Sequence, residues 1–175
     1  MILGLDISTS ITGYTVLDED SKIVLCDHID LRKKKNFFEK SICVEEVLEN
    51  IKKEYSIDQV YIESPFTFFR SGGSSATTMA ILQRFNGVIS WMCYNIFNTE
   101  PNYLGATAAR KLCGITVPRG QKAKQVVVKF VLDNVDGFHV EYTRSQNPKP
   151  GYADRADSYV IARAGFIECT QKNLK

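Results

Sequence analysis

The hydrophobic positions in the amino-terminal part of the chain fall into short runs that are separated by polar turns. Residues 1–5 are apolar and lead into Asp6, and a second apolar run begins after Gly13 and ends at Leu17. A third run, residues 22–29, follows the polar turn at residues 18–21. Because runs of this length between turn residues are typical of strands, the pattern predicts a three-stranded antiparallel meander.

The rest of the chain alternates between helical spacing and short apolar runs. Apolar residues recur at helical spacing at about residues 37–55, 74–97, 106–113 and 121–134, and a last helix is predicted to begin near Tyr152. A buried strand at residues 60–62 runs into Glu63, and residues 101–104 predict a short fifth strand. This pattern predicts an α/β fold in one domain, residues 1–175.

Two segments, residues 74–97 and residues 144–151, lead to further predictions. The helix at residues 74–97, capped by Ser74 or Ser75, is apolar on more than one face, which predicts a central helix or a subunit interface. The segment at residues 144–151 is polar and proline-rich, so we expect a loop that can become mobile near a site.

The composition is that of an ordinary globular protein, with 44% hydrophobic and 24% charged residues. Five scattered cysteines without a CxxC pair indicate reduced thiols and argue against a zinc site. With two histidines in the chain, histidine-centred catalysis is disfavoured. No apolar run approaches the roughly 20 residues of a membrane span, and nothing resembles a signal peptide. We therefore expect a cytoplasmic protein with no membrane partner.

The charges are distributed unevenly along the chain. Residues 1–63 carry thirteen acids and eight bases, whereas residues 64–132 carry one acid, Glu100, and eight bases. A long segment with so few acids favours a surface that binds a polyanion, and nucleic acid is the first candidate. The alternative is that these bases lie on solvated helix faces and balance the amino-terminal acids.

Four carboxylates occupy positions that are typical of a functional site. Asp6 and Glu63 each end a buried strand, where open α/β sheets place their sites, and Asp154 and Asp157 share a face in the first turn of the last helix. Taken alone, Asp6 fits equally well a turn aspartate that accepts from the amide of Ser8 or Thr9. The pair in the last helix has a similar alternative, as ordinary acids of a helix N-terminus.

If the last helix packs over the ends of these strands, the four acids converge. Four carboxylates at close range need cations, and an all-oxygen set without histidine or cysteine selects Mg²⁺ or Mn²⁺. A pair of such ions beside a basic surface is typical of phosphodiester hydrolysis. A nearby lysine could stabilise charge in the transition state.

The segment after Glu63 combines aromatic residues with a cation. Phe66, Phe68, Phe69 and Arg70 lie in a predicted loop that is closed by glycines 72 and 73. Aromatic residues of this kind usually pack against the core. If they are exposed beside an acidic site, they would suit stacking on nucleobases.

Taken together, these motifs resemble the RuvC-type Holliday-junction resolvases of the ribonuclease H-like superfamily. The resemblance rests on Gly4-Leu5-Asp6 with Thr12-Gly13-Tyr14, on Tyr61-Ile62-Glu63, and on Ala153-Asp154-Arg155-Ala156-Asp157 with Tyr159-Val160-Ile161-Ala162, in order over nearly the whole chain. It implies a mixed five-stranded sheet flanked by helices, with the first three strands antiparallel. It also implies a homodimer that places two sites on opposite strands of a four-way DNA junction.

The same resemblance implies roles for individual residues. Asp6, Glu63, Asp154 and Asp157 correspond to the metal ligands, with Mg²⁺ or Mn²⁺ and two ions per site. Phe66 corresponds to an aromatic residue that stacks at the opened junction centre, and Lys122 to a catalytic or phosphate-binding lysine. The family's other basic position falls at Arg110 or Lys111. The full DNA-binding set is Phe66, Phe68, Phe69, Arg70, Arg110, Lys111, Arg119, Lys122 and Lys124.

The chain also departs from the bacterial cellular enzymes of this kind. The three phenylalanines after Glu63 and the long loop at residues 144–151 look more like the phage branch. Such an enzyme would act in a bacterial host, could cut replication forks and other branched DNA, and would need no motor partner. Two other hypotheses are an ATPase or sugar-kinase-like nucleotide-binding module, which shares the glycine-rich hairpin, and a branched-DNA binder without catalysis.

Overall fold

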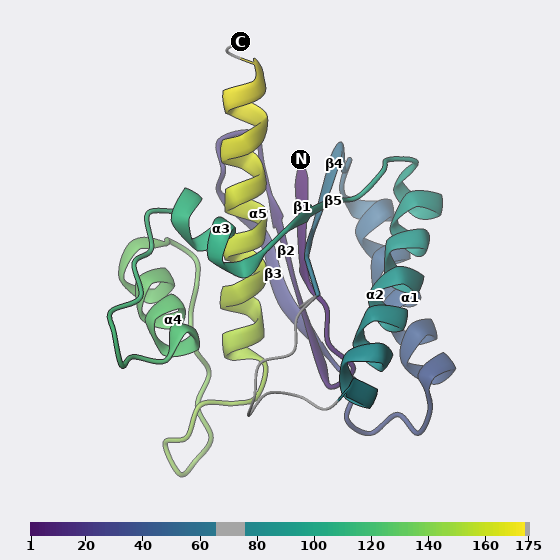
Figure 1. The fold of residues 1–175 in the computed structure, drawn as a ribbon, viewed down its shortest axis with the longest axis horizontal. Coiled ribbons are helices and arrows are strands. Elements are labelled where there is room, and N and C mark those ends of the chain that lie inside the picture. Colours follow the sequence, from purple (N-terminus) through teal and green to yellow (C-terminus); the bar gives the residue numbers. More distant parts are fainter. Residues whose placement is uncertain (66–75, 174–175) are drawn as a thin grey trace.

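The computed structural model describes residues 1–65 and 76–173, and these residues form a five-stranded mixed sheet with helices on both faces (Figure 1). The strands are β1 (Ile2–Asp6), β2 (Ile11–Leu17), β3 (Ile23–Asp30), β4 (Gln59–Glu63) and β5 (Asn102–Leu104). Their order in the sheet is β3-β2-β1-β4-β5. β1, β2 and β3 are antiparallel, whereas β4 runs parallel to β1 and to β5. The predicted meander and fold class are confirmed.

The helices cover the sheet in two layers. They are α1 (Phe37–Glu54), α2 (Ala76–Phe97), α3 (Ala106–Leu112), α4 (Ala123–Asn134) and α5 (Tyr152–Asn173). α1 and α2 cover one face, while α5 lies across the other face with α3 and α4 outside it (Figure 1). No helix of the described residues is long and apolar enough to cross a membrane.

One helix begins later than the periodicity predicts. α4 starts at Ala123 rather than Gln121, because a turn in which the Gln121 amide donates to Pro118 O precedes it and Lys122 occupies the N-cap position. The predicted caps of α2, Ser74 and Ser75, lie outside the described residues. The segment at residues 144–151, predicted as a loop, forms most of a small hairpin and the link from that hairpin to α5, which are described below.

The sequence of β1 explains why it lies at the centre of the sheet. Leu3 and Leu5 are fully buried against the α1–α2 layer, and Ile2 faces the α5 layer. A strand that is apolar on both faces can only be stable between two layers. This burial brings the strand end, Asp6, to the boundary between the core and solvent.

Glycines in β1 and β2 allow α5 to lie directly on the sheet. A Cβ atom at Gly13 would overlap the carbonyl oxygen of Asp154, and one at Gly4 would overlap the Cβ of Ala162. Thr15 and Ser158, both buried, join β2 to α5 by a hydroxyl–hydroxyl hydrogen bond of 2.9 Å. The first turn of α5 is therefore held beside the ends of the central strands.

We predict that Gly13→Ala lowers the free energy of unfolding by about 3 kcal/mol, because the added methyl group would meet helix backbone that cannot move aside without displacing α5. Urea denaturation measures the effect. The matched control is Gly87→Ala in α2, where a Cβ meets nothing within 4 Å; a helical alanine there is expected to leave stability unchanged or raise it by up to about 1 kcal/mol. Equal stability of Gly13→Ala and wild type would contradict this packing.

Candidate active site

The four acids that the sequence singles out lie at one edge of the sheet. Asp6 ends β1 and Glu63 ends β4, and these neighbouring parallel strands pair Leu5 with Ile62, so both carboxylates emerge at the same edge. α5 begins at this edge (Figure 1) and contributes Asp154 and Asp157 from its first turns. The predicted convergence is present in the structure.

Burial and the charges of neighbouring acids raise the pKa of three of these carboxylates, Asp6, Glu63 and Asp157. Burial, followed by the charges of Glu63, Asp157 and Asp154, raises the pKa of Asp6 well above its ordinary value of 3.8. Burial and the charge of Asp157 raise the pKa of Glu63 from 4.5 to about 7. Burial raises the pKa of Asp157 from 3.8 to about 6. Such shifts indicate carboxylates that are buried close to one another, an arrangement found at functional sites.

Two cations from the outer helices face this cluster. The ammonium of Lys124, in α4, lies 2.8 Å from Asp154 Oδ1 and 3.8 Å from Asp157 Oδ2. Burial alone would lower the pKa of Lys124, but the hydrogen bond to Asp154 and the charges of the nearby acids raise it. Arg110, in α3, is close enough that its charge opposes the rise in the pKa of both Glu63 and Asp157. Lys124 therefore acts as an internal counter-ion for the two α5 acids.

The other predicted basic residues lie away from the acids. Lys122 is exposed at the N-cap of α4, and in residues 1–65 and 76–173 no hydrogen bond or ion pair joins it to a carboxylate. Arg119 and Lys111 are exposed as well. Of the two candidates in α3, it is Arg110 whose charge reaches Glu63. Phe66, Phe68, Phe69 and Arg70 lie outside the described residues.

A signal for Lys124 was present in the sequence. Lys124 precedes the buried residues Val127 and Val131 by three and seven positions, which places it on the inward face of the helix. Lys122 does not share this spacing and lies before the first helical residue. The helix start therefore decides which lysine reaches the acids.

The alternative interpretation of Asp6, as a turn residue that accepts from the Ser8 amide, does not agree with the structure. The Ser8 amide donates to Thr12 Oγ1 at 3.2 Å, and the Thr12 hydroxyl donates back to Ser8 O at 2.9 Å. Because Thr12 closes this turn, the Asp6 carboxylate is not needed there. Its strongest electrostatic neighbours are Glu63, Asp157 and Asp154.

The donor set fits a hard divalent cation. Asp6, Glu63, Asp154 and Asp157 offer carboxylate oxygens alone, the ligands that Mg²⁺ and Mn²⁺ prefer. Among the described residues no three acidic, histidine or cysteine side chains are already arranged as a metal centre. With Lys124 bound to Asp154 and the pKa of three acids raised, the cluster has the charge that a cation would neutralise.

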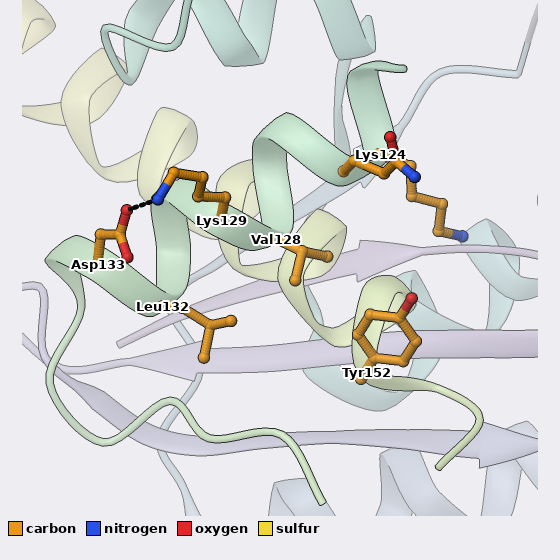
Figure 2. Close-up of a pocket in the computed structure, with 7 residues that line it drawn as sticks. Lys124, Val128, Lys129, Leu132, Asp133 and Tyr152 are labelled. Atoms are coloured by element: carbon orange, nitrogen blue, oxygen red, sulfur yellow. Dashed lines mark hydrogen bonds and ion pairs between the residues drawn. The ribbon is translucent and has the colours of Figure 1, made fainter. Parts of the chain in front are cut away.

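A groove of about 340 Å³ adjoins this cluster. Figure 2 shows Lys124, Val128 and Leu132 along α4, with Tyr152 of α5 on the other side. Gln125, Lys129 and Asp133 complete its lining, and Lys129 is paired with Asp133 at 2.8 Å. The groove therefore has a mixed lining of apolar, aromatic and charged side chains, and one of its cations, Lys124, also contacts the acids.

No family model matches the sequence, and no curated protein does. Solved structures share the fold over nearly the whole chain. Thermus thermophilus RuvC in complex with a Holliday junction substrate has a TM-score of 0.69 and 13% identity, covering 97% of this chain and 94% of that one. Thermus thermophilus RuvC in a second structure has a TM-score of 0.64 and 13% identity, with coverage of 98% and 96%. A yeast mitochondrial Holliday junction resolvase has a TM-score of 0.64 and 15% identity, with coverage of 99% and 80%.

Proposed function

We propose that this chain is a structure-selective DNA endonuclease that cleaves four-way junctions by divalent-metal-dependent phosphodiester hydrolysis, leaving 5′-phosphate and 3′-hydroxyl ends. The single observation that carries the proposal is the cluster of Asp6, Glu63, Asp154 and Asp157 at one sheet edge with Lys124 against it. The fold supports it, because one solved structure with this fold is bound to a Holliday junction.

Asp6, Glu63, Asp154 and Asp157 would hold the metal, and we propose two Mg²⁺ or Mn²⁺ ions. When bound, such ions supply an activated water and stabilise the leaving oxygen. The protein positions the four carboxylates through two strand ends and one helix, so the site is built on rigid elements. Lys124 leaves its pairing with Asp154 to stabilise negative charge on the scissile phosphate, and Arg110 supports the same charge from α3.

The remaining predicted residues form the proposed DNA surface. Lys122, Arg119 and Lys111 are exposed cations near the start of α4 and in α3, where they would bind flanking phosphates. Phe66, Phe68 and Phe69 keep their proposed role in stacking at the junction centre, with Arg70 beside them. Because half or more of protein–DNA hydrogen bonds go to phosphates and sugars, this set would position the DNA without reading its sequence.

The proposal also covers other branched DNA substrates and the resemblance to the phage branch. We infer that replication forks and other branched DNA can also be cut, without a motor partner, as in the phage-type branch. The long segment before α5 supports that branch. An ATPase or sugar-kinase-like module is less well supported, because RuvC structures match 97% and 98% of this chain. A non-catalytic DNA binder would not require four clustered acids.

The proposed function is tested with synthetic four-way, three-way, flap and linear DNA, each incubated with the protein and Mg²⁺. We predict that four-way junctions are nicked on opposite strands at more than about a hundred times the rate of linear duplex. The nicks should be sealed by DNA ligase, since ligase requires 5′-phosphate and 3′-hydroxyl ends. EDTA should stop the reaction. Cleavage that persists in EDTA, or equal cleavage of linear DNA, would refute the proposal.

A homodimer is part of the proposal, because opposite-strand nicking needs two sites. The surface that supports it lies on α1 and α2, where Phe38, Ile42, Trp91 and Tyr94 are 74, 52, 65 and 52% exposed. A cavity of about 630 Å³ lies beside the same two helices; Phe37, Phe38, Ile81 and Val88 line it together with polar residues that include Lys35, Lys40 and Arg84. Exposed apolar area of this extent on neighbouring helices is typical of an interface.

We predict that light scattering reports the mass of two chains and that Trp91→Lys shifts it to the mass of one. Lysine at the centre of an apolar interface has no partner and must be desolvated. Leu132→Lys, an exposed position on α4 and therefore on the other face of the sheet, is the control that should remain dimeric. A wild-type mass of one chain at micromolar concentration would contradict the dimer.

A further inference from the structure

The segment that precedes α5 is an ordered hairpin rather than a loose loop. Tyr142 pairs with Pro148 in an isolated β-bridge, and the Thr143 amide donates to Asn147 O at 2.8 Å. At its base the Lys149 amide donates to Glu141 O, and the two side chains form an ion pair of 2.6 Å. We call residues 141–149 the α4–α5 hairpin. Every residue in it is exposed, so the hairpin is not held by a core of its own.

Arg155 fixes the base of this hairpin to the helix that carries two of the acids. It lies between Asp154 and Asp157 in the sequence and is buried. Its Nη2 donates to His139 O at 2.8 Å, and its guanidinium lies 5.4 Å from the centre of the Phe138 ring. The hairpin therefore has a defined position relative to the acid cluster.

A second anchor lies where the hairpin joins α5. Gly151 is buried with φ of +90°, and a Cβ atom there would overlap the ring of His28 in β3. This contact seats the end of the hairpin against the sheet. Figure 1 shows the hairpin projecting past the start of α5, beyond the sheet edge at which β1 ends. The projection therefore extends from the same edge as the acids.

The groove beside Lys124 lies between the two helices that precede and follow the hairpin in the chain. α4 contributes Val128 and Leu132 to it, and Tyr152, three residues after the hairpin, lies on its opposite side (Figure 2). The groove and the base of the hairpin therefore both adjoin the start of α5, the helix that carries Asp154 and Asp157.

The hairpin presents an aromatic residue and a cation to solvent. Tyr142 is 53% exposed. Arg144 is exposed, and in the part of the chain that the structure describes it makes no hydrogen bond or ion pair. Glu141 is already neutralised by Lys149, so it does not repel an anion there. A cation and an aromatic ring on a projecting hairpin suit a sugar–phosphate backbone.

We infer that the α4–α5 hairpin and the adjoining groove form a second DNA-contact surface, which holds a duplex arm beyond the scissile phosphate. Arg144 contacts a backbone phosphate, and Tyr142 packs against the sugars of the same arm. This inference rests on the proposed nuclease function, and it assigns a substrate contact to a segment that the acid cluster does not require. A protein partner for the hairpin is the competing outcome.

The test is the affinity for a four-way junction, measured by fluorescence anisotropy in EDTA so that cleavage does not intervene. Arg144→Ala is expected to weaken binding about tenfold. It should also reduce the slope of log K against log salt by about 0.9, because one phosphate contact is lost. Tyr142→Ala is expected to weaken binding about fivefold with the slope unchanged.

The matched control is Lys53→Ala, which removes one exposed cation near the end of α1. It should bind like wild type, and all variants should melt at the wild-type temperature because none of the three side chains is buried. If Arg144→Ala and Tyr142→Ala bind like Lys53→Ala, the hairpin does not contact the junction and the inference is wrong. Wild-type junction cleavage is scored separately, so failure of the proposed function is distinguishable from failure of this inference.

Discussion

Asp6→Asn is expected to reduce the rate of junction cleavage by at least about a thousandfold while changing the affinity for the junction by less than about twofold. Asparagine keeps the size of the side chain but removes the charge that faces Glu63, Asp157 and Asp154. A thousandfold loss corresponds to about 4 kcal/mol of transition-state stabilisation, which is reasonable for a central ligand of a metal site. Single-turnover cleavage in Mg²⁺ and anisotropy in EDTA measure the two quantities.

The same variant has a second readout that does not depend on cleavage. Glu63 and Asp157 bind protons more tightly in the folded protein, with pKa values of about 7 and about 6, than their ordinary values of 4.5 and 3.8. Protonation therefore favours the folded state, and the metal-free protein should lose stability as the pH rises from about 4 to about 7. A shift of two pKa units corresponds to about 3 kcal/mol.

Because Asp6→Asn removes one of the repelling charges, the metal-free variant should be more stable than wild type above pH 7. Added Mg²⁺ should raise the melting temperature of wild type more than that of the variant. Asp136→Asn, a change of the same chemistry at an exposed position with no ion pair among the described residues, is the matched control and should show neither effect. Wild-type cleavage by Asp6→Asn would remove the carboxylate from the mechanism.

Lys124→Ala is expected to lower the rate of cleavage at saturating enzyme by about a hundredfold, with a smaller effect on binding. Its ammonium lies 2.8 Å from Asp154 Oδ1. Among the residues that the structure describes, it is the cation that contacts the acid cluster directly. Loss of one preorganised charge at a developing anion costs about 10²–10³ in rate. The measurement is single-turnover cleavage at several enzyme concentrations, which separates rate from affinity.

Lys122→Ala is the matched control. It also removes a lysine side chain, but from the exposed N-cap position two residues before Lys124. It should weaken binding a few-fold and leave the rate at saturating enzyme unchanged. Lys124→Arg should recover part of the rate, because it restores the charge with a different shape. A larger loss of rate in Lys122→Ala than in Lys124→Ala would reverse the two roles and return to the expectation from the sequence.

The sequence was sufficient to predict the sheet and the convergence of the four acids at its edge. Short apolar runs ending in Asp6 and Glu63 define β1 and β4, and their parallel pairing brings the two carboxylates to one edge. The spacing of Asp154 and Asp157 placed both on the face of α5 that meets the sheet. These features could be predicted because the apolar runs in the sequence correspond to strands that are buried on both faces.

The choice of lysine was only partly available in the sequence. The spacing from Lys124 to Val127 and Val131 signals its inward position, but the family resemblance pointed to Lys122. Excluding Lys122 requires the start of α4, which the turn at Pro118 sets at Ala123 and which leaves Lys122 at the N-cap. The α4–α5 hairpin was out of reach, because it is held by Arg155 and His28 from distant elements. The predicted stacking of Phe66, Phe68 and Phe69 lies outside the described residues and stays a prediction.

Crystals grown with Mn²⁺, measured for anomalous scattering, test most directly that these four carboxylates form a divalent-metal site. We expect an anomalous peak bounded by Asp6, Glu63, Asp154 and Asp157, with Lys124 no longer paired to Asp154, and no peak at this place in crystals of Asp6→Asn. Wild-type crystals in millimolar Mn²⁺ that show no peak among these carboxylates, with the Lys124–Asp154 pair intact, would contradict this expectation.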